Sequence, residues 1–168
     1  MGDLVLVGGA GGIGRELANR AHADGWKVTV MDLEKSLSKH PPSNGIKSKV
    51  IDLTDPSSIT GAFSGFSEIS GFVNLAGFMQ GLCSIKKTQS KDFDDVINLN
   101  LKGAFLVAKE VLPFMRENGG SIVNVVSGLA SNVRPGYGAY SISKAGLINL
   151  TKTLALEEAP KIRVNAVG

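Results

Sequence analysis

A tyrosine and a lysine stand four residues apart at Tyr140 and Lys144, inside a segment whose apolar residues recur at helical spacing. Residues four apart lie on one face of a helix, one turn from each other. The lysine ammonium can therefore reach the phenol, where a positive charge favours the phenolate and lowers a pKa that is about 10 in water. The pair predicts a tyrosine that acts as an acid or a base. Alone, it also fits an exposed helix face, so the rest of the sequence must decide.

A glycine-rich stretch near the N-terminus predicts a phosphate-binding loop. The apolar run 4–7 stops at GGAGGIG, and helical spacing follows as far as Gly25. Gly8 allows a sharp turn, Gly12 lets the backbone approach a pyrophosphate, and Gly14 lets the helix pack close to the strand. The helix N-terminus would face the anion. A mere tight turn is the alternative, and the order strand, loop, helix favours phosphate binding.

Two acids follow at the ends of the next two expected strands. Asp32 lies 18 residues after Gly14, a distance that places a carboxylate to accept hydrogen bonds from the ribose hydroxyls of an adenosine. The same charge would repel a 2′-phosphate, which favours NAD over NADP. Asp52 either caps the helix that begins near Pro56 or lies beside the adenine ring, and the two roles are compatible.

The apolar pattern predicts a doubly wound parallel sheet of the Rossmann type, in three α/β/α layers and one domain covering 1–168. Small residues at Ala76 and Gly77 leave room for a ligand at the topological switch point. Segments 36–49 and 128–138 are expected to be irregular. The expected strands are 4–7, 27–32, 49–53, 71–77, 121–127 and 162–167, and the expected helices are 13–25, 56–64, 92–118 and 139–158.

Composition excludes several classes of partner. The net charge of +3 comes from 18 basic and 15 acidic residues spread along the chain, so no nucleic-acid partner is expected. The single cysteine, Cys83, excludes an internal disulfide framework and fits a reducing compartment. Without a membrane-spanning run or a signal peptide, we expect a soluble cytoplasmic protein with no membrane partner. His22 and His40 have no ligand partners in the pattern, so no metal site is expected.

These motifs, taken together from Val5 to Val167, resemble the short-chain dehydrogenase/reductase family. The cofactor motifs are the glycine loop, with Val7 in place of the usual threonine, and Asn74-Leu75-Ala76-Gly77, which is similar to the family's Asn-Asn-Ala-Gly. The resemblance implies a set of NAD-binding residues, which are Gly8, Gly12, Ile13, Gly14, Asp32, Asp52, Leu53, Asn74, Ala76, Gly77, Tyr140 and Lys144.

The catalytic residues of the family also have matches here. Asn100-Leu101-Lys102-Gly103 matches the segment with the catalytic asparagine, and Ser127, Tyr140 and Lys144 match the serine, tyrosine and lysine. The resemblance implies an NAD-dependent oxidoreductase that interconverts an alcohol and a ketone or aldehyde. Tyr140 would then transfer the proton, Lys144 would lower its pKa, Ser127 would bind the substrate oxygen, and Asn100 would support a water relay.

One departure from the family is large. Family chains continue past the sixth strand with a further strand and helices, whereas this sequence ends at Gly168. We therefore expect a domain that lacks the final strand, with 162–167 left as an exposed edge. A catalytically impaired NAD(H)-binding module, or a regulatory subunit of the same fold, is the alternative. The resemblance also implies a homodimer or homotetramer built through the helices around Phe105 and Leu150, the tetramer being the weaker assembly.

Overall fold

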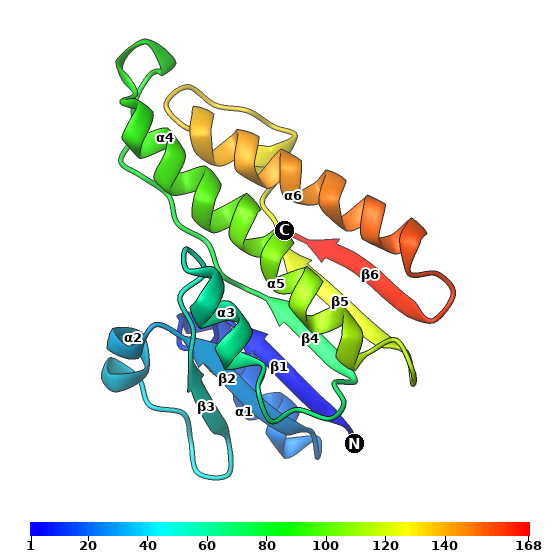
Figure 1. Ribbon diagram of the computed structural model, residues 1–168. Coiled ribbons are helices and arrows are strands. Elements are labelled where there is room, and N and C mark those ends of the chain that lie inside the picture. The colour runs from blue at the N-terminus through cyan, green and yellow to red at the C-terminus, as the bar shows by residue number, and fades with distance from the viewer.

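The computed structural model describes residues 1–168 and is built on one six-stranded parallel sheet (Figure 1). The strand order is β3-β2-β1-β4-β5-β6, and every neighbouring pair is parallel. This order confirms the predicted doubly wound sheet, with its switch point between β1 and β4. The strands are β1 (Asp3–Val7), β2 (Lys27–Asp32), β3 (Lys47–Val50), β4 (Gly71–Asn74), β5 (Gly120–Val125) and β6 (Ile162–Val167).

Helices cover the two faces of the sheet unequally. Because side chains alternate along a strand, Leu6 of β1 belongs to a cluster with residues of α1, while Val5 of the same strand belongs to a larger cluster that includes residues of α3, α5 and α6. The short helix α2 lies beside the edge strand β3. The helices are α1 (Gly12–Ala23), α2 (Glu34–Lys39), α3 (Pro56–Ala62), α4 (Ser90–Ile97), α5 (Ala104–Val111) and α6 (Gly138–Glu157).

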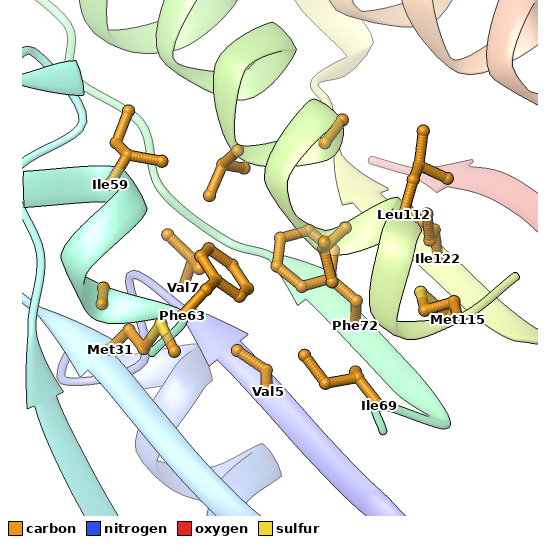
Figure 2. Packing of buried hydrophobic residues seen from close by; sticks show 14 of the residues in the cluster. Val5, Val7, Met31, Ile59, Phe63, Ile69, Phe72, Leu112, Met115 and Ile122 are labelled. Carbon is orange, nitrogen blue, oxygen red and sulfur yellow. The ribbon is translucent and has the colours of Figure 1, made fainter. Parts of the chain in front are cut away.

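The larger core lies between the sheet and the helices α3, α5 and α6 (Figure 2). Phe63, at the end of α3, is fully buried and stacks on Phe114, with 6.1 Å between the ring centroids. Its ring also contacts Phe72 of β4, with 6.5 Å between the centroids. Burial of such large aromatic side chains is the main favourable contribution to folding, and here it fixes α3 and α5 over the sheet.

The predicted helix 92–118 is one continuous helical segment with a change of geometry inside it. It begins as α4 at Ser90, becomes a π-helix over Asn98–Gly103, and continues as α5 and a short 3-10 turn that ends at Phe114. A hydrogen atom replaces the side chain at Gly103, where a Cβ would lie 2.9 Å from the Cβ of Leu53. The helix therefore passes very close to the connection that follows β3.

The prediction that 36–49 is irregular was wrong at both ends. Its first residues belong to α2, which ends at Lys39. Pro41 and Pro42 restrict the backbone only beyond this end, so they do not prevent the helix. Its last residues begin β3, which starts at Lys47 and ends at Val50 rather than spanning 49–53. The first residues of this strand are polar, so the apolar pattern did not predict them as a strand. An edge strand can be polar because it is exposed and pairs with β2 through backbone groups.

Asp52 does not cap α3. The N-cap is Asp55, whose carboxylate accepts a hydrogen bond of 2.9 Å from the Ser57 N–H, and Pro56 takes the first helical position. Asp52 instead accepts hydrogen bonds from the backbone N–H and the hydroxyl of Thr54. The expected capping role of Asp52 was therefore wrong, because the carboxylate that caps a helix must directly precede its first turn.

The strand β6 forms one edge of the sheet, as expected. On the side covered by α1, a groove of about 810 Å³ runs between α1 and the strands β4, β5 and β6, with Trp26 and Val123 among its lining residues. None of the helices combines the length and the apolar character needed to cross a bilayer.

The close packing of α1 on the glycine loop gives a test of the fold. A Cβ at Gly14 would lie 2.5 Å from the Cα of Gly9, so Gly14→Ala should lower the free energy of unfolding by roughly 1–3 kcal/mol. Gly12→Ala is the control, because a Cβ there meets no atom within 4 Å. Urea unfolding measures both variants. Equal stability of the two would contradict this packing.

Candidate functional site

A cavity of about 740 Å³ opens at the carboxyl ends of β1, β2 and β4, beside the switch point of the sheet. A crevice at this place is where doubly wound sheets bind their ligands. It extends from the glycine loop to Phe78, and Lys35 and His40 stand on its α2 side. Six of the predicted cofactor-binding residues line it, which are Gly8, Asp32, Asp52, Leu53, Ala76 and Gly77.

The glycine loop presents free donors at one side of this cavity. The backbone N–H groups of Gly12, Ile13 and Gly14 donate to no acceptor in the protein, as expected for the first turn of a helix. Open space surrounds the place that a Cβ of Gly12 would occupy, whereas a Cβ at Gly8 would lie 2.6 Å from the Ala76 nitrogen. Free N–H groups beside an unobstructed backbone fit the pyrophosphate of a dinucleotide.

Asp32 lies at the end of β2, where its carboxylate is held by two backbone N–H groups. The Ala10 N–H donates to Oδ2 at 3.0 Å, and the Leu33 N–H donates to Oδ1 at 2.8 Å. These bonds fix the carboxylate against the glycine loop while each oxygen keeps a lone pair for a further donor. Asp32 thus keeps acceptor capacity at the cavity, and its binding of a ribose stays a prediction.

Lys144 lies on α6 with its ammonium buried beneath the Gly77 end of the cavity. The side chain is 3% exposed, and Nζ donates a hydrogen bond of 2.8 Å to the Val125 carbonyl at the end of β5. A Cβ at Gly77 would lie 3.2 Å from this nitrogen, so any larger residue there would press on the lysine. Burial lowers the pKa of Lys144 to about 8, because the interior solvates an ammonium less well than water does.

Asn100, in the π-helical segment, ties three parts of the chain together. Its amide nitrogen donates to the Phe78 carbonyl at 2.8 Å and to the Ser143 hydroxyl at 3.0 Å, and its oxygen accepts from the Phe78 N–H at 2.7 Å. Ser143 in turn donates to the Tyr140 carbonyl at 2.7 Å. Both donors of the Asn100 amide are therefore used to fix the loop after β4 against the first turns of α6.

Tyr140 and Ser127 lie at the two ends of the segment that joins β5 to α6. Tyr140 is half-buried in the first turn of α6, with the Lys144 ammonium 5.8 Å from the centroid of its ring. Ser127 follows β5, and its hydroxyl accepts a hydrogen bond of 3.2 Å from the Leu129 N–H. The strand ends at Val125 rather than at residue 127 as predicted, so Ser127 belongs to the loop.

Two buried side chains, Asn74 and Ser143, support the site without lining the cavity. Asn74 is buried, and its side-chain oxygen accepts a hydrogen bond of 3.2 Å from the Ala76 N–H, which shapes the loop lining the cavity. Ser143 was not predicted, although a serine fully buried next to Lys144 had to find hydrogen-bond partners. The polar wall that α2 forms was not predicted either, because that helix was not expected.

Comparison with known proteins gives the family. A family model described as short chain dehydrogenase matches residues 4–168. The chain belongs to the short-chain dehydrogenase family. Members of this family are oxidoreductases that bind nicotinamide cofactors and act on alcohol or carbonyl groups.

Several relatives are identical to this chain at about a third of the aligned residues. It is 33% identical to a 2-dehydro-3-deoxy-L-rhamnonate dehydrogenase (NAD(+)) of Sphingomonas sp., over 94% of this chain and 66% of the relative. It is 38% identical to carbonyl reductase [NADPH] 2 of Sus scrofa, over 99% of this chain and 70% of the relative. The crystal structure of an NAD⁺-bound xylitol dehydrogenase superposes with a TM-score of 0.87 at 31% identity, over 98% of this chain and 68% of the other. The chain thus spans about two thirds of the length of these relatives.

The buried ammonium of Lys144 predicts an unusual pH dependence of stability. Because its pKa is about 8 when folded and near 10.5 when unfolded, the unfolded chain binds more protons between these values. The cost of burying the charge is about 3 kcal/mol below pH 8, and it disappears as the pH rises toward 10.5. Lys144→Met removes this cost but leaves the Val125 carbonyl without its donor. The variant should therefore unfold at a higher urea concentration than wild type near pH 7, and this advantage should vanish near pH 10.

Lys152→Met is the control for this experiment, since Lys152 lies on the same helix and is exposed. Its unfolding midpoint should follow that of the wild type at every pH. A Lys144→Met variant that is less stable than wild type near pH 7 would mean that the hydrogen bond to Val125 outweighs the cost of burial.

Proposed function

We propose that this chain is an NAD-dependent oxidoreductase that interconverts an alcohol and a ketone or aldehyde. The observation that carries the proposal is the buried ammonium of Lys144. It lies beneath the Gly77 end of the cavity and beside the ring of Tyr140. Burying a charge is costly, and such a cost is typical of residues kept for chemistry rather than for stability. When bound, NAD(H) would supply the hydride chemistry.

The side chains of the protein have separate tasks in this proposal. Tyr140 transfers the proton to or from the substrate oxygen, and the positive charge of Lys144 stabilises the phenolate that this transfer leaves. Ser127 donates a hydrogen bond to the substrate oxygen as negative charge develops on it. Lys144 also binds the ribose on the nicotinamide side. Asn100 supports a proton relay through Lys144 by means of its Oδ1, which accepts one hydrogen bond and keeps a second lone pair.

The cofactor is held by the groups described above. The free N–H groups of Gly12, Ile13 and Gly14 bind the pyrophosphate, and Asp32 binds the ribose of the adenosine. Asp52 and Leu53 line the cavity where the adenine ring would lie. The relatives support nicotinamide binding, and their names include both NAD and NADPH. We also propose a homodimer or homotetramer through the helices around Phe105 and Leu150, because the Phe105 side chain is 55% exposed.

Tyr140→Phe tests the proton transfer, because it removes only the hydroxyl group. Turnover should fall by about a hundredfold or more, while binding of NADH should weaken far less, because most of the residues assigned to the cofactor are kept. NADH absorbance over a panel of alcohols and ketones measures turnover, and fluorescence titration measures binding. Tyr137→Phe, the same change at the only other tyrosine, is the control and should keep most of the activity. A Tyr140→Phe variant with wild-type turnover would refute the assignment, and a wild type that binds NADH without any turnover would favour a binding module.

Replacement of Asp32 tests the choice of cofactor. Asp32→Ala should weaken NADH binding by about tenfold, because the ribose loses a charged acceptor, and should strengthen NADPH binding because a repulsive charge is gone. Asp32→Asn is the control, since it removes the charge and keeps one oxygen. It should strengthen NADPH binding while weakening NADH less than alanine does. Fluorescence titration of NADH and NADPH gives the affinity of each variant relative to wild type. If the ratio of NADH to NADPH affinity stays at the wild-type value in both variants, this role of Asp32 is contradicted.

A further inference from the structure

Ser143 lies on α6 between the two residues of the tyrosine and lysine pair. Its side chain is fully buried and does not line the large cavity, so it is out of reach of a substrate or cofactor bound there. Any effect of Ser143 on the reaction must therefore pass through the two groups that its hydroxyl contacts. These are the Asn100 amide and the Tyr140 carbonyl.

The single proton of this hydroxyl determines how it contacts Asn100. Ser143 donates that proton to the Tyr140 carbonyl at 2.7 Å. Its oxygen then acts only as an acceptor, because a serine hydroxyl has one donor and two acceptor lone pairs. The group of Asn100 that faces it, at 3.0 Å, is accordingly the amide nitrogen. Through Ser143, the backbone of α6 thus decides which end of the Asn100 amide points toward the helix.

The backbone of Phe78 specifies the same orientation of the amide. Its N–H donates to Asn100 Oδ1 at 2.7 Å, and its carbonyl accepts from Asn100 Nδ2 at 2.8 Å. These two bonds join the Asn100 side chain only to the loop after β4. The bond to Ser143 is the one that ties it to α6, the helix that carries Tyr140 and Lys144.

The space beside Gly77 shows why the position of this amide matters. A Cβ at Gly77 would lie 3.2 Å from Lys144 Nζ and 4.0 Å from Asn100 Oδ1, so both atoms border the same small volume. Oδ1 keeps one lone pair free after its bond to the Phe78 N–H. A proton path between Asn100 and Lys144 depends on their separation, and a misplacement of about 1 Å in an active site lowers a rate by up to about a hundredfold.

We propose that Ser143 is a positioning residue for the reaction, which holds Asn100 Oδ1 beside the Lys144 ammonium. This role rests on the proposed function, and in particular on the proton relay through Asn100 and Lys144. Ser143 takes part in no chemical step, and its proton stays on its own oxygen. It acts by fixing the Asn100 amide, so its removal slows proton transfer and leaves cofactor binding intact.

Ser143→Ala tests this role, with Ser141→Ala as the matched control. The first variant should lose about tenfold in turnover and change its NADH affinity by less than about twofold, because only the relay is displaced. The control makes the same change on the same helix, at a serine that is 6% exposed and whose hydroxyl has no partner in the protein. It should keep wild-type turnover and affinity. NADH absorbance measures turnover per NADH-binding site, and fluorescence titration measures binding.

The solvent isotope effect separates slower proton transfer from a loss of folded protein. Turnover in heavy water, relative to ordinary water, should fall further in Ser143→Ala than in wild type, because proton transfer then limits the rate more strongly. A variant that only contains less folded protein has the wild-type ratio. Ser143→Cys nearly keeps the size of the side chain and weakens its hydrogen bonds, so its turnover should lie between wild type and alanine. It carries the same test if the alanine variant does not fold.

A double variant shows whether Ser143 acts through Asn100. In an Asn100→Ala background, Ser143→Ala should lower turnover by less than about twofold, since the amide that it positions is already gone. Losses that multiply in the double variant would mean that Ser143 acts by another route, and they would overturn the inference.

The outcomes also separate this inference from the proposed function. A Ser143→Ala variant with wild-type turnover, with the wild-type isotope effect, or with the same loss as Ser141→Ala would overturn the role of Ser143 and leave the oxidoreductase proposal standing. A wild type that binds NADH but turns over no alcohol or ketone would refute both.

Discussion

The arrangement of this site depends on burying one ammonium group, that of Lys144. Its hydrogen bond to the Val125 carbonyl joins α6 to the end of β5, and its nitrogen fills the space that a side chain at Gly77 would need. A charge in such a place destabilises the fold at neutral pH, which is why its pKa falls to about 8. The surrounding elements must therefore supply enough packing energy to hold it. The buried aromatic core around Phe63 and Phe72 contributes to that packing.

Two polar links keep α6 in register with the sheet. Near its start, Ser143 connects Asn100 to the Tyr140 carbonyl, so that the π-helical segment, the loop after β4 and the first turn of α6 are held as one unit. Further along, the amide of Asn124 in β5 donates to the Thr151 hydroxyl at 3.0 Å. If α6 moved along the sheet, these buried polar groups would lose their hydrogen-bond partners, which costs free energy. The pairs therefore fix the position of the helix. The tyrosine and the lysine are thereby positioned relative to the strand ends.

Opposite charges meet in the part of the cavity between β2 and α2. Asp32 is fixed by two backbone N–H groups, while α2 contributes Lys35 and Lys39 to the same cavity. Selectivity between two cofactors that differ by one phosphate is a difference between two binding free energies, and it can be changed from either side. The short helix α2 thus brings two positive charges to this cavity although it contributes no buried residue to the core.

The sequence by itself determined the presence of the six strands and of most helices between them, because apolar periodicity and glycine spacing are local properties of the chain. It also placed Tyr140 and Lys144 one turn apart. It misjudged α2 and β3, since an edge strand and a surface helix need few apolar residues. Only the tertiary structure decided that Ser143 links Asn100 to α6, and that Asn100 uses both amide donors for positioning. Such contacts join residues far apart in the chain, where spacing along the sequence carries no information about distance in space.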